Sequence, residues 1–182
     1  MNSIAVFCGS SMPNKEIYKD QILKLPDYFI EHKIKLIYGG ASIGLMGLLA
    51  DRILEQGGYV IGIMPEVLAG NEIIHQHLTE THIVKDMAER KQLLIELANH
   101  FIAYPGGCGT MDEIFEVITL SQIGLLDKSF GFLNIDSFYE GIETYLNKAR
   151  SVNLLSSTNR NKILIDSDIN TFMSKLIPNT IE

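Results

Sequence analysis

Residues 102–113 combine an apolar run, a turn with three glycines and the start of a helix, in the order Ile-Ala-Tyr-Pro-Gly-Gly-Cys-Gly-Thr-Met-Asp-Glu. Glycine allows a ligand to approach the main chain closely, and the first turn of a helix has backbone N–H groups without intrahelical partners. Those donors and the positive end of the helix dipole suit a phosphate group. The segment therefore predicts a strand, a phosphate-binding turn and a helix in succession.

Two carboxylates, Asp112 and Glu113, follow directly behind this turn. A negative side chain in the first turn of a helix interacts favourably with the helix dipole, which is one explanation for both residues. The alternative is that a carboxylate acts in catalysis on a bound nucleotide. The motif alone leaves both explanations open.

Four motifs of the chain follow the order and spacing of a known family. They are Val-Phe-Cys-Gly-Ser-Ser at residues 6–11, Tyr-Gly-Gly-Ala-Ser-Ile-Gly-Leu-Met-Gly at residues 38–47, Met-Ala-Glu-Arg-Lys at residues 87–91 and Pro-Gly-Gly-x-Gly-Thr-x-x-Glu at residues 105–113. In these motifs the chain resembles the LOG family, the cytokinin riboside 5′-monophosphate phosphoribohydrolases. The resemblance covers residues 3–150, and the rest of the chain matches only in outline.

The length and composition of the chain are those of one globular domain over residues 1–182. With 46% hydrophobic and 20% charged residues, a chain of this length buries about 70% of its unfolded surface. No segment reaches the roughly 18 apolar residues of a membrane-spanning helix, and residues 1–8 lack the features of a signal peptide. We therefore expect a cytoplasmic protein without membrane contact, a compartment in which disulfides between its two cysteines are rare.

Charge and residue types argue against nucleic acid and metal ions as partners. The net charge of −7 is opposite to the basic surface of a general nucleic-acid binder, so a phosphate must be held by local groups. His75, His77 and His82 are potential metal ligands, but no cysteine or carboxylate cluster completes a coordination set. We interpret them as polar loop histidines and expect no metal and no cofactor.

Apolar runs and helical patterns alternate along the chain. Residues 4–8 form a continuous apolar run, typical of a central strand covered on both faces, and a helix that Pro26 kinks is expected from Pro13 onward. Residues 66–82 are expected to form a loop with a short helical turn, and residues 156–159 a polar, mobile linker. The further expected strands are residues 34–38, 59–64, 81–84, 101–104, 130–135 and 163–165, and the further expected helices are residues 44–56, 87–99, 110–123, 138–150 and 169–177.

This alternation predicts an α/β fold with a single doubly wound, mostly parallel Rossmann-like sheet and helices on both faces. Ligands of such sheets bind beyond the carboxyl ends of the strands, where the strand order reverses. The turns after the first, second and fifth strands lie at that edge and include Gly9, Ser10 and Gly40. Together with Arg90 and Glu113 they can hold a nucleotide monophosphate without a metal. NAD fits less well, because residues 39–44 lack the required glycine spacing and no acidic residue closes a following strand.

The family resemblance implies hydrolysis of the N-glycosidic bond of a nucleoside 5′-monophosphate, with Arg90 and Glu113 as catalytic residues. Cleavage builds positive charge on the sugar, which a fixed carboxylate such as Glu113 stabilises while it orients or deprotonates water. Arginine stays protonated, so we assign Arg90 an electrostatic and positional role. The alternative for Arg90 is an exposed cation at the start of a helix.

The resemblance also implies a set of substrate contacts. Lys91 either belongs to this set or lies on the surface, and Thr119 either contacts the substrate or bonds to its own helix backbone. The chain departs from the family pattern at Ala41, usually a glycine, and at Leu120, usually an aromatic residue. The implied contacts are Glu72, Lys91, Gly106, Gly107, Cys108, Gly109, Thr110, Met111, Asp112 and Thr119.

Two other functions compete with the hydrolase. A nucleotide-binding carrier or sensor, resembling molybdenum-cofactor carriers, would share the fold but has no need of a carboxylate that faces an anionic ligand. A pyridoxal-dependent lysine decarboxylase, a label that this family has often carried, needs a Schiff-base lysine in a much larger cofactor fold. The presence of both Arg90 and Glu113 favours the hydrolase.

The helix expected at residues 110–123 and the residues after it carry more apolar side chains than one sheet face needs. A surface helix buries a stripe of roughly 100°, and this set would span more. An excess apolar face usually meets a partner, most often a second copy, and the resemblance also implies a homodimer. The alternative is that C-terminal helices of the same chain cover this face. The side chains are Phe115, Ile118, Leu120, Ile123, Leu125 and Leu126.

Overall fold

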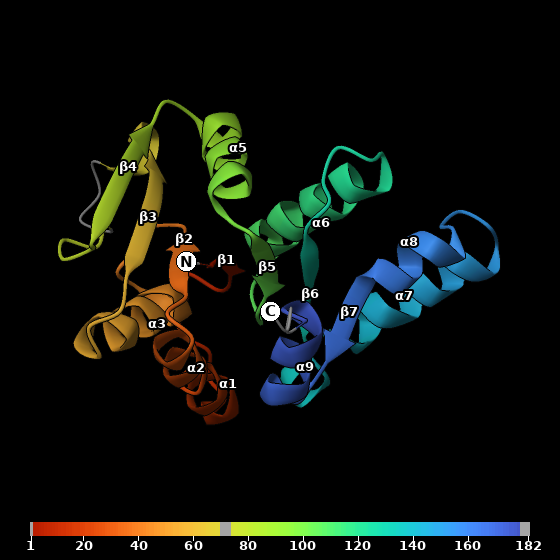
Figure 1. Cartoon of the computed structure of the whole chain (residues 1–182), viewed down its shortest axis with the longest axis horizontal. Helices are drawn as coiled ribbons and strands as arrows, with labels where there is room; N and C mark the ends of the chain where they lie inside the picture. Colours follow the sequence, from red (N-terminus) through yellow and green to blue (C-terminus); the bar gives the residue numbers. More distant parts are fainter. Residues whose placement is uncertain (1, 70–73, 179–182) are drawn as a thin grey trace.

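The computed structural model describes residues 2–69 and 74–178, with a seven-stranded sheet in the order β4-β3-β2-β1-β5-β6-β7 (Figure 1). Every neighbouring pair of these strands is parallel, which confirms the doubly wound α/β sheet expected from the sequence. The strands are β1 (Ser3–Phe7), β2 (Lys35–Tyr38), β3 (Val60–Pro65), β4 (Glu80–Val84), β5 (His100–Ala103), β6 (Ser129–Leu133) and β7 (Ile163–Asp166).

β1 is the middle strand, as its continuous apolar run predicts. All of its residues are buried because layers of helices cover both faces of the sheet. Ile4 lies opposite Leu36 of β2 on one side and opposite His100 of β5 on the other. The strand order reverses between β1 and β5, so a ligand site is expected beyond the carboxyl ends of these strands.

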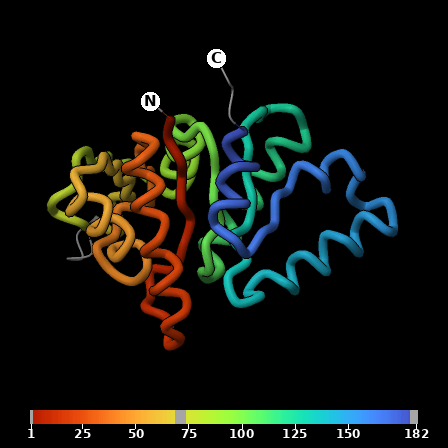
Figure 2. Tube along the Cα trace, turned by 60° about the horizontal axis from the view of Figure 1, so that its bottom comes forward, coloured from red at the N-terminus to blue at the C-terminus, as the bar shows by residue number. Residues whose placement is uncertain are grey.

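Helices pack on both faces of the sheet (Figure 1, Figure 2). One face carries α1 (Glu16–Ile22), α2 (Leu25–Glu31), α3 (Gly44–Glu55) and α9 (Ile169–Leu176), and the other carries α5 (Met87–Leu97) and α6 (Cys108–Gln122). The short helix α4 (Glu66–Ala69) follows β3, and a 3₁₀ turn (Ile135–Ser137) follows β6. α7 (Glu140–Ser151) and α8 (Ser157–Lys162) form a helical hairpin that extends away from the sheet in both views.

The single kinked helix expected from Pro13 is wrong. The segment forms two helices, because α1 ends at Ile22 and α2 begins at Leu25. Pro26 stands in the first turn of α2, where its missing N–H group would have no intrahelical partner in any case. Proline therefore starts a second helix instead of bending one long helix.

The polar linker expected at residues 156–159 is also wrong, because these residues begin α8. The Ser156 hydroxyl accepts a hydrogen bond from the Asn159 N–H group at 3.1 Å, which is the geometry of a helix N-cap. Serine and asparagine favour caps and turns for the same reason, since their short polar side chains bond to nearby backbone groups. Composition alone therefore does not distinguish a polar linker from the start of a helix.

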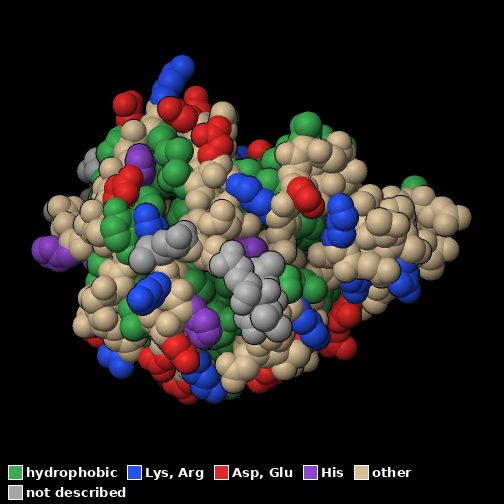
Figure 3. Space-filling model, viewed as in Figure 1, with side chains coloured by type: hydrophobic (Ala, Val, Ile, Leu, Met, Phe, Trp, Pro, Cys, Tyr) green, Lys and Arg blue, Asp and Glu red, His purple; other side chains and the backbone are tan. Residues whose placement is uncertain are grey.

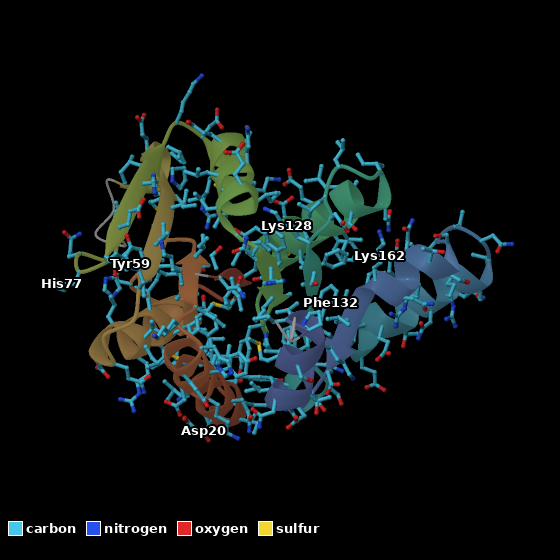
Figure 4. The ribbon with its side chains drawn as sticks, viewed as in Figure 1. Asp20, Tyr59, His77, Lys128, Phe132 and Lys162 are labelled. Atoms are coloured by element: carbon cyan, nitrogen blue, oxygen red, sulfur yellow. The ribbon has the colours of Figure 1, made fainter. Side chains whose placement is uncertain are left out.

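Charges of both signs are interspersed on the face of the molecule that Figure 3 presents. Within the part of the chain that the structure describes, no helix has the length and apolar character needed to cross a bilayer. The three histidines differ from one another. His77 is exposed at the outer edge of the molecule (Figure 4), and His75 also lies in the loop before β4 but is buried. His82 lies in β4, so the interpretation as a loop histidine is wrong for this residue.

Candidate active site

A cavity of about 450 Å³ opens at the carboxyl ends of β1, β2 and β5, within the roughly 300–1,000 Å³ typical of ligand sites. The three turns that the sequence predicted to converge all line it. They contribute Cys8, Gly9 and Ser10 after β1, Gly39, Ala41 and Ile43 after β2, and Gly107, Cys108 and Gly109 after β5. The remaining lining residues are Met46, Met64, Leu68, Arg90, Thr110 and Glu113.

Arg90 reaches the cavity from the first turn of α5. The Asp86 side chain fixes the start of this helix by accepting hydrogen bonds from two N–H groups of the first turn. Arg90 Nε donates to the Ile63 carbonyl oxygen at 3.0 Å, and Arg90 Nη1 donates to Glu113 Oε1 at 2.8 Å. Arg90 is only 7% exposed, so it is a buried cation and not an exposed cation at a helix start.

Gly39, directly after β2, makes room for this guanidinium. A Cβ atom at this position would lie 2.2 Å from Arg90 Nη2, far inside van der Waals contact. Any side chain at position 39 would therefore displace the guanidinium from its place between β3 and Glu113. The Tyr-Gly-Gly motif thus serves the cation as well as the turn.

Glu113 projects from the second turn of α6 and is only 6% exposed. Burial raises the pKa of its carboxyl above the ordinary value, and the charge of Arg90 opposes that shift. A raised pKa makes a carboxylate a stronger base, which suits it to accept a proton from water. Because α6 begins at Cys108, two residues earlier than expected, Glu113 lies beyond the first turn, where an interaction with the helix dipole is weak.

The start of α6 presents backbone donors to the cavity. Gly107 is the N-cap residue of α6, and as a glycine it has no side chain that could cap the first N–H groups of this helix. Cys108, Gly109 and Thr110 form the first turn and line the cavity. These donors and the helix dipole favour an anionic group such as a phosphate.

The turns around the cavity pack against one another through their backbones. The Gly9 N–H group donates to the Pro105 carbonyl oxygen at 3.2 Å, and the Gly9 carbonyl oxygen accepts from the Leu45 N–H group at 3.0 Å. At Gly44, where φ is +63°, a Cβ atom would lie 2.3 Å from the carbonyl carbon of Ser10. Glycine is required there both for the left-handed conformation and for the close contact.

The other predicted substrate contacts that the structure describes do not line the cavity. Lys91 pairs with Asp112 at 3.2 Å and with Glu116 at 2.8 Å, beside the cavity and outside its lining. Thr119 Oγ1 donates to the Phe115 carbonyl oxygen at 2.7 Å, which is the bond to its own helix, and Thr119 lies away from the cavity. Gly40, Gly106, Met111 and Asp112 adjoin lining residues, and Glu72 lies outside the described residues.

Both cysteines lie at the cavity as free thiols, with Cys8 buried and Cys108 exposed. Burial raises the pKa of the Cys8 thiol well above its ordinary value, and the nearby Glu113 charge adds to this shift. A thiol of this kind is neutral and unreactive. Cys8 therefore acts as a packing residue behind the turn after β1.

One side of the cavity is apolar, and sequence reasoning did not assign it. Met46 falls inside the motif of residues 38–47, but a methionine at helical spacing looks like any core residue. Ala41 is buried and pairs with Ile74 through an antiparallel bridge, so its methyl group fits where the family usually has glycine. We call this side the apolar wall and define it by Ala41, Ile43, Met46, Met64 and Leu68.

The apolar side chains at the end of α6 divide into two groups. Ile118 and Leu126 are buried, whereas Ile123 and Leu125 are 63% and 72% exposed. A cavity of about 360 Å³ lies between α6 and α7, with Phe115 among its lining residues. α7 of the same chain therefore covers part of the apolar face and leaves the end of α6 uncovered.

Comparison with known proteins extends these observations. A family model described as "Possible lysine decarboxylase" matches residues 46–176. Cytokinin riboside 5′-monophosphate phosphoribohydrolase LOG2 from Arabidopsis thaliana is 44% identical over 161 residues, covering 88% of this chain and 76% of that protein. The corresponding LOG1 of the same plant is 39% identical over 173 residues, covering 95% and 81%.

Among solved structures, the molybdenum cofactor binding protein from Rippkaea orientalis matches with a TM-score of 0.71, covering 100% of this chain and 98% of that one. Its identity of 18% shows a shared fold alone. The sequence relatives show more, because their identity near 40% extends over most of both chains. The chain thus belongs to the LOG family, the cytokinin riboside 5′-monophosphate phosphoribohydrolases.

Proposed function

We propose that this protein hydrolyses the N-glycosidic bond of a purine riboside 5′-monophosphate, such as N6-isopentenyladenosine monophosphate or AMP. The products are the free base and ribose 5-phosphate. The observation that carries the proposal is the buried Arg90–Glu113 pair, 2.8 Å apart, in a cavity that also receives the start of α6. The names of the curated relatives support the same reaction.

In this reaction the bond between C1′ and the base nitrogen breaks, the oxygen of water bonds to C1′, and one proton of that water ends on the base. Positive charge develops at the sugar, and the Glu113 carboxylate stabilises it and takes the proton from water. This proton then passes to the departing base, which returns Glu113 to the carboxylate form. Arg90 orients this carboxylate and supplies positive potential for the departing base. The phosphate binds at the start of α6, and the base rests against the apolar wall.

A carrier or sensor that binds a nucleotide without cleaving it is the second candidate, because the chain shares its fold with molybdenum cofactor carriers. The buried Glu113 speaks against it, since a desolvated carboxylate beside an anionic ligand weakens binding. A decarboxylase of the pyridoxal type needs a lysine in the cavity. None of the described residues that line the cavity is a lysine.

The decisive experiment incubates the purified protein with AMP and, separately, with N6-isopentenyladenosine monophosphate, and separates the products by chromatography. We expect free base and ribose 5-phosphate in equal amounts. Binding of either nucleotide without release of base would support the carrier instead. The corresponding nucleosides, which lack the phosphate, are the control and should be cleaved far more slowly.

We also propose a homodimer in which the exposed end of α6 contacts a second copy. Ile123 and Leu125 support it, because large apolar side chains this exposed are costly in a monomer. Sedimentation at micromolar concentration should find a species of twice 20.4 kDa. Leu125→Asp should convert it to the monomer, whereas Val67→Asp, at another exposed apolar residue far along the chain, should not. A wild-type monomer would refute the dimer.

A further inference from the structure

The buried histidine His75 joins two segments that form the apolar wall. It lies between α4 and β4 and is only 5% exposed. The backbone N–H group of His75 donates to the Gly40 carbonyl oxygen at 3.0 Å, and the preceding residue, Ile74, forms the antiparallel bridge with Ala41. Residues 74 and 75 thus pair with the turn after β2, which lines the cavity through Gly39 and Ala41.

Both ring nitrogens of His75 have partners. Nδ1 accepts a hydrogen bond from the His77 N–H group at 3.2 Å, so the proton of the neutral ring is on Nε2. Nε2 lies 2.8 Å from Asp51 Oδ1 and donates to it. Asp51 belongs to α3, the helix whose first turn carries Met46 into the cavity. The ring of His75 therefore bonds to α3, while the His75 backbone bonds to the turn after β2.

We infer that His75, anchored by Asp51, is a positioning residue that fixes the apolar wall against the nucleotide. Two parts of this wall meet at His75: the turn with Ala41 and the helix with Met46. The Asp51 side chain is 58% exposed. An ion pair or hydrogen bond that is so open to water adds little to global stability. Its effect is therefore local, on the geometry of the wall.

The inference rests on the proposed function for its kinetic test. Asp51→Ala removes the anchor, and a lost hydrogen bond of this kind should raise KM for AMP about threefold to fivefold while kcat stays within about twofold. Asp51→Asn keeps an oxygen acceptor for Nε2–H and should restore a KM near that of the wild type. If Asp51 contributed only to global stability, KM would be the same in Asp51→Ala, Asp51→Asn and the wild type.

Two substitutions of the histidine divide its contacts. His75→Gln places an amide N–H near the Nε2 position and keeps the bond to Asp51. His75→Asn supplies an acceptor near the Nδ1 position but loses the bond to Asp51. KM should rise more in His75→Asn than in His75→Gln. The matched control is His82→Asn, which removes another histidine–carboxylate pair, His82 Nε2 to Glu80 Oε1 at 2.6 Å, outside the cavity. It should leave KM unchanged.

Amide hydrogen exchange tests the same role without catalysis. In Asp51→Ala, peptides that cover residues 38–46 and 74–79 should exchange faster, and peptides from β5 to β7 should not change. Unchanged exchange in the first two regions, or an unchanged KM, would overturn the inference. If the wild-type protein cleaves no nucleotide, the proposed function fails, and the exchange result alone decides whether Asp51 and His75 hold the wall.

Discussion

The two ends of α5 each hold a basic side chain, and only one of these is favoured by the helix. At the C-terminal end, Lys128 Nζ donates to the carbonyl oxygens of Ile95 and Ala98 at 2.8 and 2.6 Å (Figure 4). The negative pole of the helix dipole attracts this cation. At the N-terminal end, Arg90 is buried in the first turn, where the positive pole opposes a cation.

This difference separates a structural cation from a functional one. Lys128 satisfies carbonyl groups that every helix end leaves without partners. Arg90 is placed against the local field and depends on Glu113 for its neutralisation. A buried ion pair of this kind adds little net stability, so local energetics does not explain it. A residue that its own helix disfavours is best explained by a ligand.

Glu113→Gln should give the largest effect. The amide keeps the shape and still accepts a hydrogen bond from Arg90, but it carries no charge and cannot take a proton. We expect kcat for base release to fall about 10³-fold, with the dissociation constant of AMP measured by calorimetry changed little. Glu116→Gln, on the same helix and outside the cavity lining, is the control. Wild-type turnover in Glu113→Gln would remove Glu113 from the mechanism.

Arg90→Lys should have the next largest effect. The ammonium keeps the charge but cannot bond to both the Ile63 carbonyl and Glu113 as the guanidinium does. The carboxylate loses its orientation, and we expect kcat/KM to fall about 10²-fold, with weaker AMP binding. Arg52→Lys, at a surface pair on α3, should behave as wild type. An unchanged affinity would mean that Arg90 does not contribute to binding.

The pH dependence should reveal the burial of Glu113. Burial raises the pKa of this carboxyl above its ordinary 4.5, so the reactive carboxylate forms only at higher pH than in an exposed glutamate. The plot of log kcat/KM against pH should therefore rise through a pKa above 4.5. The same shift favours the protonated folded state, so this contribution to stability is present below 4.5 and is lost as pH rises through the folded pKa. A rise of log kcat/KM through a pKa of 4.5, the ordinary value of a glutamate, would contradict the burial of Glu113 as the cause.

Lys128→Met should have the smallest effect on catalysis and a clear effect on stability. It removes the hydrogen bonds to the end of α5 while keeping an unbranched side chain of similar length. We expect the free energy of unfolding, measured with urea, to fall by about 1–2 kcal/mol, with kcat/KM unchanged. Lost activity at unchanged stability would mean that Lys128, at the C-terminal end of α5, is a functional cation and not a structural one.

Much of the fold and the centre of the site could be predicted because both follow local patterns. The apolar run of residues 4–8 indicated the central strand, and the glycine turns marked the carboxyl ends of three strands. Arg90 and Glu113 were predicted from motifs far apart in the sequence, and the structure places them 2.8 Å apart at the reversal of strand order. Their catalytic roles remain predictions.

The features that could not be predicted depend on contacts between distant segments or on residues with two uses. The burial of His75 depends on Asp51 and Gly40, which no pattern near His75 announces. The apolar wall gathers side chains from separate elements that look like core residues one at a time. Pro26 and Ser156 are compatible with a break or with a helix start, and only the packed structure decides between them.

The close contacts at Gly39 and Gly44 affect how changes in related proteins are to be interpreted. The nearest atoms to a new methyl group at Gly44 belong to the backbone of the turn after β1, and not to any ligand. A relative that has lost catalysis would still need this glycine in order to fold. A glycine retained at position 44 therefore shows only that a relative has the same scaffold. Replacement of Glu113 would mark a relative that has lost the reaction. If Arg90 were lost as well, the close contact that requires glycine at position 39 would be relieved.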